Sequence, residues 1–254
     1  MQFRLKAFGL HLLGSVIVLT LVLGSLWLGW YRWPGWYLSS VLHVVGIVVM
    51  VDLLMGPTLT LIVANPGKLR RVFTRDVAVI VSVQLVALVY GSVTLWSGRP
   101  LYYAFSMNSL DCVQASDIDV SEAAVALHQN PTFAPHWYSL PRWIWAPLPD
   151  DPDEAMGIVN SASFGSGKDV TEMPRYFKPW EQGLPKLRDH LMRLDDIKEL
   201  NKREKQYLHE RLSADGLAPD GRNLLIMWGG SRRVVAIFDP ATLRLKALLR
   251  ADLA

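Results

Sequence analysis

Residues 51–63 read Val-Asp-Leu-Leu-Met-Gly-Pro-Thr-Leu-Thr-Leu-Ile-Val, and this stretch decides how the whole chain is interpreted. It lies inside a long apolar segment whose only charged residue is Asp52. Such a segment is long enough to cross a lipid bilayer. Because a carboxylate near the bilayer centre costs about 2.5–3.5 kcal/mol on insertion scales, its presence there indicates that Asp52 has a role.

The pair Gly56-Pro57 interrupts the same segment. Proline removes one helical hydrogen bond and clashes one turn back, at Leu53. The carbonyl group freed there needs another partner in lipid, and two side chains nearby could supply one: Thr58 and Thr60. We therefore expect a kink just after Asp52, and a kink beside a small residue lets another helix approach closely.

The composition divides the chain into a membrane part and a water-soluble part. The 254 residues are 51% hydrophobic, and most of the excess lies before Gly98. Three candidate spans cover about 8–31, 37–64 and 77–97, so that 1–98 form a transmembrane domain and 99–254 a soluble domain. A cleaved signal peptide is disfavoured, because the first apolar run is too long and no small-x-small cleavage site follows it.

Basic residues indicate the orientation in the membrane. The loop 65–76 between the second and third spans carries Lys68, Arg70, Arg71 and Arg75, and the chain begins with Arg4 and Lys6. The positive-inside rule then predicts a cytoplasmic N-terminus and a cytoplasmic loop. Three spans place 99–254 on the far side, which is the periplasm if the host is a bacterium and the membrane its inner membrane. The net charge of +3 does not indicate nucleic-acid binding.

Asp52 and Gln84 fall near the middle of the second and third spans, so the two side chains can form a hydrogen bond at similar depth. The favoured interpretation is a structural clamp between helices. A contact of Asp52 with a partner's membrane helix is the main alternative, and which of the two holds is left open. An ion path is least favoured, because no second intramembrane acid accompanies Asp52. His11 and His43 are expected to be packed or interfacial rather than ligands.

The soluble part is predicted to be a small α+β domain. Strands are expected at 101–108, 110–115, 223–228, 232–238 and 243–249, and helices at 116–128, 151–163 and within 184–212. Ser116 and Asp151 are the expected caps of the first two helices. The glycine-containing segment 164–169 is interpreted as a plain turn, because its spacing does not match a phosphate loop.

The aromatic segment 140–149 is too rich in proline for a regular helix. Trp143 and Trp145 within it are expected to fill a core or to contact lipid headgroups. The alternative is that they form a binding surface. The single cysteine, Cys112, is interpreted as a buried apolar residue rather than a reactive thiol or an intermolecular disulfide. The histidines lie far apart and no nucleophile has a recognisable setting, so neither an enzyme nor a metal or cofactor site is expected.

Several short runs resemble the TfpX/TfpZ family of type IV pilin accessory proteins. They are Arg-Leu-Lys-Ala-Phe-Gly-Leu-His-Leu at 4–12, the stretch 51–63 running on to Asn-Pro-Gly-Lys at 65–68, and segments at 76–80, 84–91 and 99–105. Pro-Arg-Tyr-Phe-Lys-Pro-Trp at 174–180 is similar as well. The resemblance implies an inner-membrane protein that assists assembly or stability of a type IV pilin and has no assigned catalytic activity.

The favoured function is thus a non-enzymatic accessory factor, or chaperone, for a type IV pilin. Asp52, Gly56, Pro57 and Gln84 would form a docking groove or helix clamp, and Trp143 and Trp145 a periplasmic contact. The expected partners are a pilin and the bilayer, with the oligomeric state left open. The alternative is a membrane-anchored periplasmic sensor or regulatory subunit, which a polar pocket in the soluble domain would favour. An enzyme acting on pilin or on a lipid-linked sugar is the third possibility.

Overall fold

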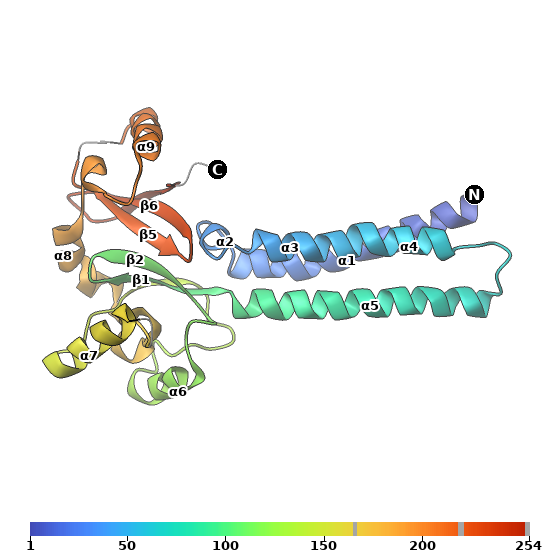
Figure 1. The fold of residues 1–254 in the computed structure, drawn as a ribbon, viewed down its shortest axis with the longest axis horizontal. Coiled ribbons are helices and arrows are strands. Elements are labelled where there is room, and N and C mark those ends of the chain that lie inside the picture. Colours follow the sequence, from blue (N-terminus) through green and yellow to red (C-terminus); the bar gives the residue numbers. More distant parts are fainter. Residues whose placement is uncertain (165–166, 218–220, 252–254) are drawn as a thin grey trace. The chain divides into compact units, whose positions relative to one another are not determined.

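A computed structural model describes residues 1–164, 167–217 and 221–251 (Figure 1). The chain forms two compact units, one made of Met1–Arg32 and Val41–Gly98 and the other of Trp33–Ser40 and the chain from Arg99 onward. The predicted class, three N-terminal membrane helices followed by an α+β domain, is confirmed. Residues 33–40 belong to the second unit, although the sequence-based boundary at 98 leaves them with the membrane helices. The turn predicted at 164–169 lies partly outside the described residues.

The first unit consists of long helices that run side by side (Figure 1). Helix α1 is Gln2–Gly29, and α5 is Arg70–Ser97. Between them one continuous helix is divided into α3 (Leu42–Val49), a π-helical segment η1 (Met50–Met55) and α4 (Gly56–Val63). Among the described residues these three helices are long and apolar enough to cross a membrane.

Each helix begins at a different residue from its predicted span. Helix α1 begins at Gln2 rather than near 8. The second helix begins at Leu42 rather than near 37, because Gly35–Leu38 form a separate short helix, α2, in the second unit. The third begins at Arg70, so that most of the basic residues predicted in the loop form its first turns. Lys68 and Asp76 form an ion pair of 2.9 Å across this helix start.

The first unit is held together by a narrow apolar seam and by close approach of the helices. Leu19, Val48 and Leu88 form a buried cluster with one residue from each helix. A side chain added at Gly91 would collide with Val48, so α3 and α5 approach at a glycine. Many other apolar side chains face outward, as expected for helices surrounded by lipid.

The second unit is built on a sheet of seven strands among the described residues, in the order β4-β3-β1-β2-β5-β6-β7. The strands are β1 (Pro100–Ser106), β2 (Ser109–Gln114), β3 (Arg142–Trp145), β4 (Lys178–Pro179), β5 (Leu224–Gly229), β6 (Arg232–Phe238) and β7 (Leu245–Arg250). Strand β3 is parallel to β1 and β5 is parallel to β2, whereas the other neighbours are antiparallel.

Helices cover this sheet on both faces. They are α6 (Val120–Gln129), α7 (Pro152–Ser163), α8 (Trp180–His190) and α9 (Lys202–Ala214), with 3-10 turns at Val170–Glu172, Pro174–Tyr176 and Leu194–Asp196. Asp151 caps α7 as predicted and accepts a hydrogen bond from the Asp153 N–H at 3.0 Å. Helix α6 instead begins after Asp119, which accepts from the Ser121 N–H, so Ser116 is not its cap.

Strand β1 is buried along its whole length because both faces of the sheet are covered. Tyr103 and Phe105 point into one core with α8 and α2, whereas Tyr102 and Ala104 point into another on the opposite face. A third core packs α9 against β5 and β6. The alternation of faces along β1 therefore follows the pleat of a central strand.

Residues 33–40 pack on the half of this sheet that β5, β6 and β7 form. Leu38 packs directly on Gly229, where a side chain would collide with it. The Arg250 guanidinium lies 4.9 Å from the Trp36 ring and 4.7 Å from the Tyr37 ring. These contacts explain why the segment after α1 folds with the second unit rather than extending the second membrane helix.

Candidate functional site

The π-helical segment η1 is the local consequence of Gly56-Pro57. The Gly56 N–H bonds to the carbonyl of Val51, five residues back, instead of four residues back as in an α-helix. In this wider register the N–H that Pro57 lacks would have bonded to the carbonyl of Asp52. The sequence-based expectation was that Pro57 frees the carbonyl of Leu53, one residue away, because in an α-helix each N–H bonds four residues back.

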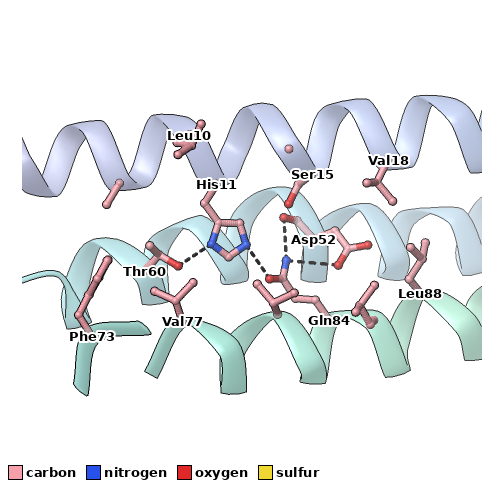
Figure 2. Close-up of a pocket in the computed structure, with 14 residues that line it drawn as sticks. Leu10, His11, Ser15, Val18, Asp52, Thr60, Phe73, Val77, Gln84 and Leu88 are labelled. Atoms are coloured by element: carbon pink, nitrogen blue, oxygen red, sulfur yellow. Dashed lines mark hydrogen bonds between the residues drawn. The ribbon is translucent and has the colours of Figure 1, made fainter. Parts of the chain in front are cut away.

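Gln84 of α5 supplies the missing donor. Its Nε2 group donates to the Asp52 carbonyl at 3.1 Å and to the Asp52 carboxyl Oδ1 at 3.3 Å. The predicted Asp52–Gln84 hydrogen bond is therefore present, and it closes within one chain (Figure 2). A side chain added at Gly56 would overlap the Gln84 amide, so the glycine is what lets Gln84 reach across.

His11 of α1 joins this pair and brings in the third helix. Its Nε2 lies 2.7 Å from Gln84 Oε1, and its Nδ1 lies 2.6 Å from Thr60 Oγ1. Because Gln84 Oε1 can only accept, His11 Nε2 carries the proton, and in the neutral ring Nδ1 accepts from the Thr60 hydroxyl. The result is one directed chain of hydrogen bonds that connects all three membrane helices (Figure 2).

Neither His11 nor Thr60 was assigned this role from the sequence. His11 was expected to be packed or interfacial, and Thr60 was expected to satisfy the carbonyl freed by Pro57. A signal was present: each is a polar residue in an apolar segment. The depth and rotation of each membrane helix depend on how the helices pack together, which the sequence does not show. It therefore does not show that His11, Thr60 and Gln84 lie at the same depth in the membrane.

A cavity of about 400 Å³ opens beside this network. The polar side chains of the network line it, together with apolar ones that include Leu10, Val18 and Leu88. It is large enough for several side chains but not for a whole helix. Asp52 is only 5% exposed, yet it lines the cavity. Among the described residues its second carboxyl oxygen has no hydrogen-bond partner.

The arrangement can therefore accept one more hydrogen bond from outside the chain. A donor or a cation that enters the cavity would meet an acceptor with little competing water, where such a bond is stronger than in solution. The apolar walls would cover the rest of the entering group. The geometry suits side chains that project from a neighbouring helix.

Trp143 and Trp145 lie elsewhere, on β3 of the second unit. The Trp143 ring contacts the rings of Tyr103 and Trp180, with centroids 5.1 and 5.2 Å away. Trp145 packs directly on Gly183 of α8. Both indoles are half-buried and pack against the core that contains Tyr103 and Phe105. Filling a core was part of the favoured interpretation from the sequence.

The second unit also contains a polar cleft of about 450 Å³. Four acidic side chains line it: Asp111, Asp117, Asp169 and Glu172. Burial raises the pKa of Asp111 to about 6 and also raises the pKa of Asp117 and of Glu172. Cys112 is buried as expected, and its burial raises the thiol pKa to about 12. In the part of the chain that is described, no three His, Cys, Asp or Glu side chains are grouped to hold a metal ion.

The chain is similar to curated fimbrial assembly proteins of Dichelobacter nodosus. It is 26% identical to those of serogroups I and E1 over 189 residues, which is 73% of this chain and 70% of each relative. It is 29% identical to that of serogroups C1 and C2 over 120 residues, 47% of this chain and 92% of the relative. No family model matches the chain. No solved structure matches it either.

Proposed function

We propose that this protein is a non-enzymatic accessory factor, or chaperone, for pilus assembly, in the manner of the TfpX/TfpZ proteins that its sequence resembles. The curated relatives named fimbrial assembly protein support a role in assembly of such fibres. The long apolar helices support a site of action in a membrane. We place that site in the bacterial inner membrane, with the N-terminus in the cytoplasm and the second unit in the periplasm.

The partner we propose is a type IV pilin held by its apolar N-terminal helix. The observation that carries this proposal is the cavity beside Asp52, because it combines apolar walls with one unpaired carboxyl oxygen. The intramolecular bonds through Gln84 and His11 fix the carboxyl group in place before a partner arrives. A pilin helix lying against the cavity would bury apolar side chains in it and donate one hydrogen bond to Asp52.

Co-purification from native membranes tests this proposal. Asp52→Asn keeps an oxygen for Gln84 but replaces the second carboxyl oxygen, the acceptor offered to the partner, by an amide group that only donates. A partner donor left buried without its acceptor costs about 1–3 kcal/mol, which would lower pilin recovery roughly tenfold. The matched control is Leu54→Ala, because Leu54 is 63% exposed on the same helix, outside the cavity. Equal recovery with Asp52→Asn and with the unmodified protein would contradict the proposal.

The polar cleft of the second unit favours one alternative, a membrane-anchored sensor or regulatory subunit. Its four acidic residues and its volume suit a small cationic ligand. If this alternative holds, a polyamine would raise the thermal stability of the full chain, and Asp52→Asn would leave that shift unchanged. Under the accessory-factor proposal the polyamine has no specific effect.

A further inference from the structure

A tight turn at 136–139 exposes two neighbouring aromatic side chains. The Ser139 N–H donates to the His136 carbonyl at 3.1 Å, and the His136 N–H donates to the Ser139 hydroxyl at 2.9 Å. Trp137 is 73% exposed and Tyr138 is 58% exposed, and Leu140 beside them is 57% exposed. We call Trp137, Tyr138 and Leu140 the aromatic turn. Its rings are held in fixed contact with one another but are not covered by the rest of the unit.

The pairing of strands shows which end of the sheet carries this turn. The turn leads into β3, which is parallel to β1 with Arg142 opposite Tyr102. The start of β3 therefore lies beside the start of β1 at Pro100. Only Gly98 and Arg99 separate Pro100 from the end of the membrane helix α5. The aromatic turn thus lies at the end of the sheet where the chain arrives from the membrane.

The other membrane connection reaches the same end. Strand β2 is antiparallel to β1, β5 is parallel to β2, and β6 is antiparallel to β5, so the hairpin between Gly229 and Arg232 points toward this end. The segment 33–40, which continues from α1, packs on that hairpin: Leu38 contacts Gly229, and the Arg232 guanidinium lies 5.2 Å from the Tyr37 ring. The opposite end of β1 is marked by the turn at Asn108.

We propose that the aromatic turn inserts into the lipid headgroups of the membrane. Indole and phenol rings prefer headgroup depth, where the apolar ring leaves water and its polar atom keeps hydrogen bonds. Both chain connections to the membrane helices enter at the end of the sheet that carries the turn. Lipid is the favoured occupant because the exposed rings lead into β3, which pairs with β1 close to the end of α5, within reach of the headgroups. This contact would fix how the domain stands on the bilayer, and it does not depend on the identity of any client.

Fluorescence quenching in nanodiscs tests the proposal with the full chain. Tyr138→Cys is labelled with the fluorophore NBD, and Asn108→Cys, exposed at the opposite end of the sheet, is the matched control. Cys112 is buried, and the unmodified chain labelled in parallel gives its background. The nanodiscs contain phosphatidylethanolamine and phosphatidylglycerol, with or without phosphatidylcholine that carries a nitroxide on its headgroup. Circular dichroism confirms that each variant is folded, since both positions are exposed.

We expect the nitroxide lipid to quench NBD at position 138 strongly, with a blue-shifted emission, and to leave position 108 unchanged. Equal and weak quenching at both positions would overturn the proposal. The same holds if position 138 becomes protected only when a purified pilin is added, because the turn would then be a client-binding surface. Trp137→Ser should reduce the quenching at position 138, whereas an unchanged value would also count against insertion of the turn.

Discussion

Replacing Pro57 and Gln84, separately and together, tests how the π-helical segment is stabilised. The Asp52 carbonyl lacks a partner N–H because of Pro57 and has Gln84 Nε2 at 3.1 Å instead. Gln84→Leu removes that donor and also the acceptor of His11. Three polar atoms lose this partner: the Asp52 carbonyl oxygen, Asp52 Oδ1 and His11 Nε2. An unpaired buried polar group costs about 1–3 kcal/mol, whereas measured interhelical bonds in membranes average about 0.6 kcal/mol because separated helices find other partners. We therefore expect a destabilisation of about 2–4 kcal/mol.

Pro57→Ala restores an N–H that can reach the Asp52 carbonyl from its own helix. In the double variant the loss of Gln84 should then cost less, and we expect a coupling of about 1 kcal/mol between the two positions. The free energy of unfolding of the four proteins is measured by titrating dodecylmaltoside micelles with sodium dodecyl sulfate and following circular dichroism. Additive effects, with a coupling below about 0.3 kcal/mol, would refute the assignment of Gln84 as the replacement for the proline N–H.

Three further predictions concern the free energy of unfolding, measured as above. Gly56→Ala should destabilise the chain by about 1–3 kcal/mol because its methyl group overlaps the Gln84 amide. The control Gly46→Ala has open space around the new methyl group and should be neutral or stabilising by up to about 1 kcal/mol. Asp111→Asn should stabilise the protein at pH 8 and have little effect at pH 4. The folded-state pKa of about 6 lies above the ordinary 3.8, so ionisation of the buried carboxyl destabilises the folded state only at a pH where that carboxyl must lose its proton. An effect that does not change with pH would contradict this. Arg250→Ala should lower the free energy of unfolding by about 1–2 kcal/mol, because it removes the cation from the Trp36 and Tyr37 rings. It should also make 33–40 more sensitive to protease, and an unchanged sensitivity would argue against this role.

The sequence predicts correctly those structural features that a single local property of the chain determines. Apolar length alone predicts the three membrane helices, and alternation predicts strand β1. The pairing of Asp52 with Gln84 was also predictable, because two polar residues at similar depth in lipid have few other partners.

The remaining features depend on how elements meet. The sequence predicts that Pro57 disturbs the helix, but not that the disturbance becomes a π-helical register with Asp52 as the freed carbonyl. His11 enters the network through the rotation of α1 against the other helices, which periodicity does not fix. The predicted spans leave 33–36 between the first two helices and assign 37–40 to the second, and only the contacts of Leu38 and Tyr37 with distant strands assign 33–40 to the second unit.

The central claim is that the cavity beside Asp52 receives side chains of a pilin helix, and site-specific photocrosslinking in native membranes tests it most directly. The crosslinking amino acid benzoylphenylalanine is placed at Leu85, which lines the cavity, or at Val83, which is 63% exposed outside it on the same helix. We predict a crosslink to pilin from position 85 that Asp52→Asn weakens, and none from position 83. Equal crosslinking from both positions, or none from position 85 while pilin still co-purifies, would contradict the account.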